Sequence, residues 1–157
     1  MDIKNQTQLQ TELEKKATKA LKAVTKEVLE IFKKDYIDKF AYIKSPKQYQ
    51  RTYEFRESWD FTEIKKNLTT LSTELWYDSS KMKTFDPERF IHGSRYSSPN
   101  DVRETLPEIL ESKQSSLWIS VSRTIKFWDW FVRAMIQGGQ LEKIMTKHFT
   151  SQGFKRI

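Results

Sequence analysis

The feature that most constrains the fold of this chain is a helical pattern without proline or glycine, from about residue 6 to residue 43. Apolar side chains recur along it at steps of three and four residues, which is the repeat of an amphipathic α-helix. They are Leu9, Leu13, Ala17, Leu21, Val24, Val28, Ile31 and Phe32, followed by Tyr36, Ile37 and Phe40. Because each residue adds about 1.5 Å, the helix would be about 55 Å long. A small domain is narrower than this, so we expect part of the helix to pack on something other than its own fold.

A second helix is predicted to begin at Ser45-Pro46, because serine is a good N-cap and proline suits the first helical position. It would run to about Ser58. Such a helix would carry an aromatic side, which is more often a core face than a ligand site. The aromatic residues concerned are Tyr49, Tyr53, Phe55 and Trp59.

From residue 61 the apolar pattern changes from a helical period to an alternating one. Residues 61–65 read as a short strand, Lys66-Asn67 as a turn, and residues 68–78 as a longer strand. The threonine and aromatic content suits a pleated surface, so a half-exposed antiparallel hairpin is predicted. In the longer strand Leu71, Thr73, Leu75 and Tyr77 would face one way, and Thr70, Ser72, Glu74 and Trp76 the other.

The remainder is predicted to be an irregular loop at residues 79–98 followed mainly by helices. One helix would run from Ser98-Pro99 to about Glu111, with Pro107 kinking or splitting it. Residues 117–121 form an apolar run that fits either a strand or an exposed loop. Two further helices are expected at residues 125–136 and 141–149, separated by Gly138-Gly139.

These elements predict an α+β fold, in which a long N-terminal helix and several shorter helices pack on a small antiparallel sheet. The length of 157 residues favours a single domain over residues 1–157. The long helix would occupy residues 1–44, and the α+β body, including the irregular loop, residues 45–157.

No arrangement of residues in the sequence predicts catalysis. The chain has no cysteine, which excludes disulfides, thiolate metal sites and cysteine nucleophiles. Neither His92 nor His148 has another metal ligand at a helical spacing. The carboxylates of Asp78, Asp86 and Glu88 match no known cation loop, and lysines lie between them. Only these carboxylates and His92 motivate an enzymatic hypothesis, so we expect no enzyme activity, no catalytic or metal-binding residue and no cofactor.

The basic charge is the main compositional clue to a partner. A formal charge of +7 and a pI of about 9.5 favour an anionic partner such as nucleic acid. Lys44, Lys47, Arg51 and Arg56 lie near aromatic residues, as in a platform for single-stranded nucleic acid. Those aromatic residues, however, belong to the side that we expect to be buried. A small basic nucleic-acid-binding protein is therefore the alternative hypothesis.

Membrane association is not expected. The first six residues lack the apolar segment of a signal peptide. No apolar run approaches the roughly 18 residues that are needed to span a bilayer.

Several segments follow one another in an order that is typical of one protein family. After the long helix come Ser45 to Trp59 (SPKQYQRTYEFRESW), a hairpin ending in Leu75 to Met82 (LWYDSSKM), and a His92-Gly93 loop. Then follow Asp101 to Glu111 (DVRETLPEILE), an aromatic helix containing Phe127-Trp128-Asp129, and the helix at 141–149. In this order they resemble the minor tail-component family of tailed bacteriophages, also described as neck or tail-completion proteins.

The resemblance implies a non-enzymatic structural protein whose copies form a ring at the head–tail junction, around the DNA channel. Its partners would be further copies of itself, six or twelve to a ring, and the adjacent neck, portal-adaptor and tail proteins. Genomic DNA would pass through the lumen without sequence-specific contacts. The protein would be assembled in the cytoplasm of a host bacterium and located in the neck or tail region of the virion. As candidate subunit-interface or core-aromatic positions we take Tyr49, Arg51, Tyr53, Trp59, Trp76, Tyr77 and Trp128.

Overall fold

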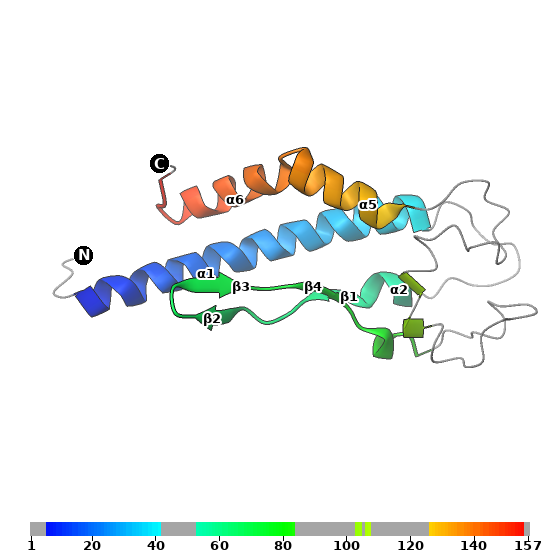
Figure 1. Cartoon of the computed structure of the whole chain (residues 1–157), viewed down its shortest axis with the longest axis horizontal. Coiled ribbons are helices and arrows are strands. Elements are labelled where there is room, and N and C mark those ends of the chain that lie inside the picture. The colour runs from blue at the N-terminus through cyan, green and yellow to red at the C-terminus, as the bar shows by residue number, and fades with distance from the viewer. Residues whose placement is uncertain (1–5, 42–52, 84–102, 105, 108–125, 156–157) are drawn as a thin grey trace, which may run out of the picture.

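The computed structural model describes residues 6–41, 53–83, 103–104, 106–107 and 126–155. Its helices and short antiparallel strands confirm the predicted α+β class. Figure 1 shows the first helix as a rod, with α5 and α6 along one side and the strands along the other. The elements are α1 (Gln6–Ile31), η1 (Phe32–Ala41), α2 (Glu54–Glu57), β1 (Trp59–Phe61), β2 (Lys65–Asn67), β3 (Thr70–Ser72), β4 (Leu75–Tyr77), η2 (Ser79–Lys81), α5 (Phe127–Val132), η3 (Arg133–Gln137) and α6 (Gln140–Ser151).

The long N-terminal helix is α-helical in α1 and continues as a π-helix in η1. The predicted helix over residues 6–43 is thus confirmed as far as Ala41, where this described segment ends. The change to a π-helix was not predicted. Backbone hydrogen bonds in a π-helix join residues five positions apart, so side chains with that spacing share a face. Phe32 and Ile37 are placed in this way, and neither has exposed surface.

The four strands form one long hairpin with a bulge in its middle. β1 pairs with β4 and β2 with β3, both antiparallel. Between these pairs, residues 62–64 on one strand face residues 73–74 on the other, which is the pattern of a β-bulge. The Thr62 N–H donates to the Glu74 carbonyl at 2.9 Å, and the Thr73 hydroxyl donates to the Thr62 carbonyl at 2.7 Å. These bonds carry the ladder across the bulge.

The predicted alternation of side chains along the second half of the hairpin is confirmed. One set of side chains is partly buried and the other exposed, as a strand with one face on a core requires. The partly buried set is Leu71, Thr73, Leu75 and Tyr77, and the exposed set is Thr70, Ser72, Glu74 and Trp76.

The hairpin turns at Leu68-Thr69, so the prediction of a turn at Lys66-Asn67 was wrong. Asparagine is a strong turn former, but here it ends β2 and pairs across the turn. The register is set further along the hairpin, where Trp59 pairs with Tyr77 and their ring centres are 5.2 Å apart. As a result Leu68 has a left-handed backbone with φ of +50°, which costs a residue other than glycine about 1–2 kcal/mol.

The second predicted helix is much shorter than expected. Residues 45–52 of that prediction lie outside the described residues, and α2 has only four residues, Glu54–Glu57. A continuous helix cannot pass through Tyr53, because its φ of +59° is left-handed. Tyr53 is also half exposed rather than buried, whereas Phe55 and Trp59 enter the core as predicted.

The two C-terminal helices agree with their predictions. α5 and η3 together cover residues 127–137, α6 covers Gln140–Ser151, and the glycine pair separates them. Gly139 has φ of +66°, which explains why a glycine is favoured at this break. The predicted loop 79–98 begins with η2, and its residues from 84 onward lie outside the described residues. The predicted helix 98–111 lies mostly, and the apolar run 117–121 entirely, outside them as well.

Helix α6 ends in a Schellman motif. The Gly153 N–H donates to the Thr150 carbonyl at 2.9 Å, and the Phe154 N–H donates to the Phe149 carbonyl at 3.1 Å. Gly153 has φ of +88°, as this motif requires. The rings of Phe149 and Phe154 lie 5.4 Å apart and supply the apolar contact that usually accompanies it.

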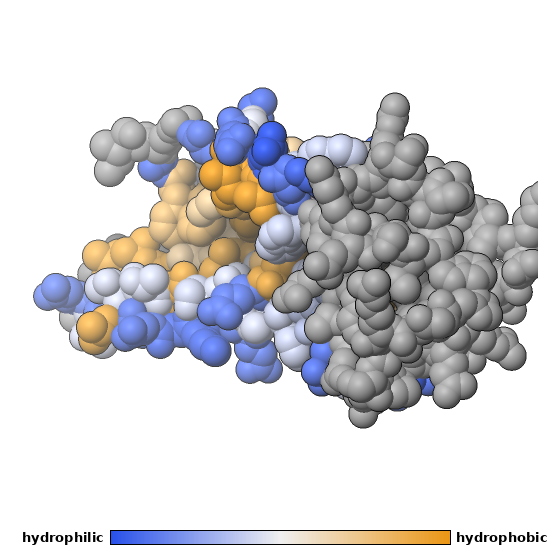
Figure 2. Space-filling model, turned by 45° about the vertical axis from the view of Figure 1, so that its right-hand side comes forward, coloured by the Kyte–Doolittle hydropathy of each residue, from blue (hydrophilic) through white to orange (hydrophobic). Residues whose placement is uncertain are grey.

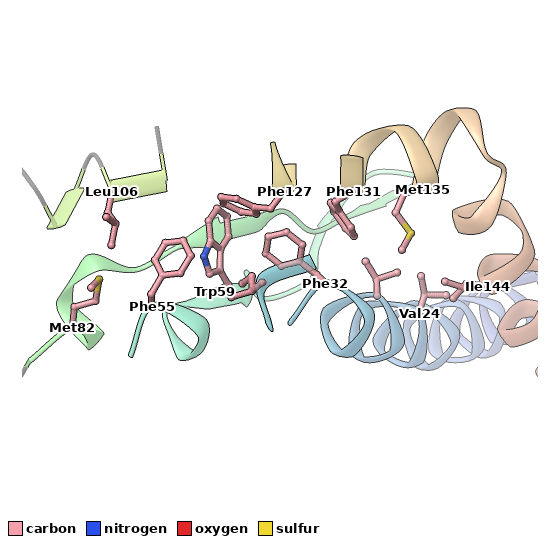
Figure 3. Packing of buried hydrophobic residues seen from close by; sticks show 12 residues of the cluster. Val24, Phe32, Phe55, Trp59, Met82, Leu106, Phe127, Phe131, Met135 and Ile144 are labelled. Carbon is pink, nitrogen blue, oxygen red and sulfur yellow. The ribbon is translucent and has the colours of Figure 1, made fainter. Parts of the chain in front are cut away.

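Phe32 lies at the centre of an aromatic core (Figure 3). Its ring centre is 4.6 Å from that of Phe131, 5.0 Å from that of Trp59 and 5.8 Å from that of Trp128. Trp59 and Trp128 also stack on each other, with ring centres 5.8 Å apart and planes inclined by 20°. These residues come from η1, the hairpin and α5, so one cluster fastens three elements together.

The core continues from the aromatic cluster along the rod as a row of aliphatic side chains. Val24 of α1 lies below Met135 of η3 and beside Ile144 of α6 (Figure 3), and Val28 belongs to the same buried cluster. This row holds the two C-terminal helices against α1.

The Schellman motif gives a prediction for Gly153→Ala. The left-handed backbone disfavours alanine, so we expect a loss of about 1 kcal/mol in the free energy of unfolding. The matched control is Gln152→Ala, whose φ of -94° suits any residue. Urea denaturation followed by circular dichroism measures both variants, and equal losses would contradict the motif's importance.

Candidate interaction surfaces

An open apolar groove is formed jointly by α1, the hairpin and the C-terminal helices. Its volume is about 290 Å³. Figure 2 shows it as an orange hollow between two rims of more polar residues. None of its lining residues is charged: Leu21, Val24, Thr25, Val28, Phe61, Thr73, Leu75, Trp128, Phe131, Val132, Met135, Ile136, Leu141 and Met145.

The groove is open because the hairpin and the C-terminal helices cover two different sides of α1. Val24 and Val28 form its floor and are buried by both neighbours. At the edge, Ile136 keeps 62% of its surface exposed and Met145 keeps 39%. Large exposed apolar patches on a soluble protein generally mark a site of interaction. The groove is therefore the first candidate for an interaction surface.

A second apolar surface lies at the N-terminal end of the rod. It is formed where the β2–β3 turn meets the first turns of α1, and we call it the end patch: Leu9, Leu13, Leu68 and Leu71. Leu68 is 85% exposed, and Leu9 and Leu13 are each exposed by more than a third. At its edge the Lys66 ammonium donates to a Glu14 carboxylate oxygen at 2.6 Å, which ties the hairpin to α1.

The face of α1 opposite its buried side carries a stripe of lysines. Lys15, Lys19, Lys22 and Lys26 follow one another at steps of four, three and four residues, so they share one face of the helix. All four are exposed, and within the described residues none of them forms an ion pair. Glu12 and Glu30 lie near the two ends of this lysine stripe.

Carboxylates of the rod are used to fasten neighbouring elements. Glu27 accepts from Lys147 and contacts His148 Nε2, both at 2.7 Å, and so links α1 to α6. Hydrogen bonds from Lys147 and then His148 hold the pKa of Glu27 below its ordinary value. The pKa of Glu14 is lowered mainly by its hydrogen bond from Lys66.

A third ion-pair group links α2 to the end of the long helix. Lys33 donates to Glu57 at 3.0 Å, and Arg56 contacts Asp38 at 3.1 Å as well as Glu57. Burial acts to raise the pKa of Glu57, but the hydrogen bonds from Lys33 and Arg56 outweigh it and the pKa is lowered. Such partly exposed pairs orient the elements more than they stabilise them.

The structure brings three of the sequence-derived candidate residues together. Trp59, Tyr77 and Trp128 meet in or beside the aromatic core, with Trp128 also lining the groove. Tyr53 and Trp76 are exposed and stand apart from the groove lining. Tyr49 and Arg51 lie outside the described residues. A role of any of these residues at a subunit interface stays a prediction.

Of the two segments that carry most of the family resemblance, residues 49–52 lie outside the described residues, whereas residues 77–82 are described and lie against residues 55–58. The Asp78 N–H donates to the Ser58 carbonyl at 2.7 Å, and Phe55 packs 5.7 Å from Tyr77 between ring centres. The Tyr77 hydroxyl donates to the Arg103 carbonyl at 2.8 Å and contacts the sulfur of the buried Met82. The described residues of 77–82 thus contribute to the packing of the fold.

Sequence reasoning missed the residues that make the groove edge and the end patch. Ile136 and Met145 fit a helical apolar pattern, and nothing in that pattern tells a buried position from an exposed one. The sequence pattern placed Leu68 at the start of the predicted strand 68–78, and not in the turn. The available signal was the excess of apolar residues in 125–136, which is more than one buried face of a helix can use.

The candidate enzymatic residues have structural roles where they are described. Asp78 is the candidate that the structure describes: it accepts from the Ser80 N–H at 3.1 Å and caps η2. The other histidine, His148, was not a candidate and contacts Glu27. Asp86, Glu88 and His92 lie outside the described residues. Among the residues that the structure describes, no three His, Asp or Glu side chains are grouped so as to hold a metal ion.

Helices of the described segments are either too short or too polar to cross a membrane.

No protein-family model matches the chain, and no match was found among curated proteins or solved structures. The function is therefore argued from the sequence segments and from the surfaces described above.

The Glu27 contact gives a prediction for Glu27→Gln. Because its folded-state pKa is lowered, the carboxylate's stabilisation is complete above the ordinary value of 4.5 and is lost as the pH falls through the folded-state pKa. Near neutral pH the variant should therefore have a lower Tm than the wild type. The corresponding loss in the free energy of unfolding is at most about 1 kcal/mol. The gap should close in acid.

Thermal unfolding at several pH values measures this difference. Glu30→Gln is the matched control, since it removes the same charge from an exposed position of α1. A gap of equal size and pH dependence in the control would show that net charge, and not the link to α6, is responsible.

Proposed function

We propose that this chain is a non-enzymatic structural subunit of the head–tail junction of a tailed bacteriophage, where its copies form a ring around the DNA channel. The open apolar groove is the observation that carries the proposal. The sequence segments that resemble neck and tail-completion proteins supply the biological setting.

The groove supports self-assembly because its apolar edge residues gain from a partner that removes them from water. Burying a side chain of the size of isoleucine or methionine is worth about 1.5–3 kcal/mol. Ile136 and Met145 keep much of that surface exposed. The groove has no charged lining residue, which suits an apolar protein segment better than a nucleotide or another anionic ligand.

Two unlike apolar surfaces suit a ring. A symmetric dimer needs one surface that matches itself, whereas a ring needs two different surfaces that match each other. The groove lies over Leu21 to Val28 of α1, and the end patch includes Leu9 and Leu13. These stretches are separated by about 12 Å along the helix, at about 1.5 Å per residue. Each copy would therefore offer two docking surfaces to its neighbours.

The lysine stripe favours a second candidate function, the binding of nucleic acid by a small basic protein. Lys15, Lys19, Lys22 and Lys26 cover about 16 Å of helix, at about 1.5 Å per residue. Phosphates follow one another along duplex DNA at intervals that such a row of ammonium groups can neutralise. In the ring proposal the same stripe would serve non-specific contact with the passing genome.

The ring proposal predicts a closed oligomer of the purified chain, alone or mixed with neighbouring head–tail proteins. Mass photometry should show one discrete high-mass species, and Ile136→Asp should abolish it because a carboxylate at the groove edge resists burial. The matched control, Gln137→Asp, places the same charge on the next exposed residue and should keep the oligomer. Both variants should retain the wild-type Tm. A monomer under every condition would overturn the proposal.

The lysine stripe predicts salt-dependent binding of duplex DNA. Changing its four lysines to glutamine should reduce the slope of log K against log salt by about 3 to 4. The control changes Lys65, Lys83, Lys143 and Lys155, which are equally exposed, and so matches the net charge. Fluorescence anisotropy of a labelled duplex measures both. The same loss in the control, or no binding at low salt, would remove this candidate.

A further inference from the structure

The β2–β3 turn presents a leucine in an unusual way. Leu68 is 85% exposed, the highest exposure of any large apolar residue in the described part of the chain. It also occupies the first position of a two-residue turn with φ of +50°, where glycine is the favoured residue. Neither the backbone conformation nor the exposure of Leu68 helps its own subunit.

A strained and exposed residue that its own fold does not require points to a role outside that fold. The side chain of Leu68 is aliphatic and stands at the tip of the hairpin. Its counterpart must therefore be an apolar hollow that is open to solvent and wide enough for a branched side chain.

The groove has the properties of that counterpart. Its lining is entirely uncharged, and it opens beside the exposed Ile136. Its volume of about 290 Å³ is at or below the lower limit for a drug-sized molecule or cofactor, but sufficient for inserted side chains. We propose that the groove of one copy receives the β2–β3 turn of a second copy, with Leu68 as the inserted side chain.

The turn that enters the groove must come from another copy. In its own subunit Leu68 lies with Leu9 and Leu13 at the end patch, whereas the groove is built over Leu21 to Val28. A turn held at one end of the rod cannot also fill a groove further along it. Each copy then gives one turn and accepts one turn, so the contact is head-to-tail and is repeated around a closed ring.

This inference rests on the self-assembly proposed above, and Leu68→Gly tests it in two opposite directions. Glycine relieves the left-handed backbone, so the Tm should be unchanged or slightly higher. Loss of the side chain should weaken self-association about ten- to hundredfold. Leu68→Met keeps an apolar side chain and should keep the oligomer. If Leu68→Gly assembles like the wild type, the inference is overturned.

Cross-linking identifies the two surfaces directly, because the chain has no cysteine of its own. A Leu68→Cys chain is mixed with an Ile136→Cys chain that carries a size tag, and a short thiol-specific linker is added. We expect a covalent dimer of one tagged and one untagged chain. Thr70→Cys and Gln137→Cys are the controls, exposed and close by in the sequence but outside the proposed contact.

The outcomes separate this inference from the proposed function. A discrete oligomer that gives no mixed dimer, or gives it equally with the control pairs, leaves the ring standing and overturns the contact. A wild-type chain that stays monomeric both alone and mixed with neighbouring head–tail proteins overturns both. The oligomer could also appear only when another head–tail protein is added, without the Leu68–Ile136 link. That result overturns the contact and indicates that the added protein, not a second copy of this chain, occupies the groove.

Discussion

The packing of aromatic rings around Phe32 is the interaction on which the rest of this structure depends. Phe32 stands where α1 passes into the π-helix η1, and it touches rings from the hairpin and from α5. Aromatic pairs of this geometry add about 0.5–1.5 kcal/mol each beyond the burial of their area. The cluster therefore concentrates much of the cohesion of the fold at one end of a long rod. The long N-terminal helix, the hairpin and α5 all meet at this point.

The open surfaces follow from that concentration. The hairpin and the C-terminal helices cover different sides of α1, whose apolar residues are buried at Ala20, Val24 and Val28 but partly exposed at Leu9 and Leu13. Ion pairs of Glu14 and Glu27 hold the hairpin and α6 against the rod at a distance from the core. They orient these elements without closing the space between them. The groove and the end patch are what this arrangement leaves for a partner.

Local patterns in the sequence were enough to predict most of the elements but not how they come together. The alternation from Thr70 to Tyr77 and the helices on either side of Gly138-Gly139 follow from side-chain period and glycine conformation alone. The π-helix, the bulge opposite residues 73–74 and the left-handed Tyr53 do not. They lie close to contacts between distant segments, such as those of Trp59 with Tyr77 and Phe32. The turn propensity of Asn67 and the N-cap propensity of Ser45 are local properties, so they carry no information about such contacts.

The groove could not be predicted from the sequence either, because it too depends on how distant segments pack together. The helical period predicts that Ile136 and Met145 share a helix surface with buried residues. Whether their side chains are exposed depends on how far the neighbouring element covers that surface. Trp59 was predicted to lie in the aromatic core or at an interface, since aromatic residues are found at both, and in this structure it is buried in the core. The choice between those two environments required the position of Trp128, which comes from a segment far along the chain.

The contact between Glu27 and Lys147 joins residues that are 120 positions apart. Folds dominated by such distant contacts form slowly, because the intervening chain must be brought together before the contact can stabilise anything. During synthesis, helix α1 leaves the ribosome long before α6 exists to cover it. Until then its row of valines and leucines is exposed to solvent. This exposed apolar face favours aggregation of the nascent chain, whereas the lysines on the other face of α1 favour its solubility.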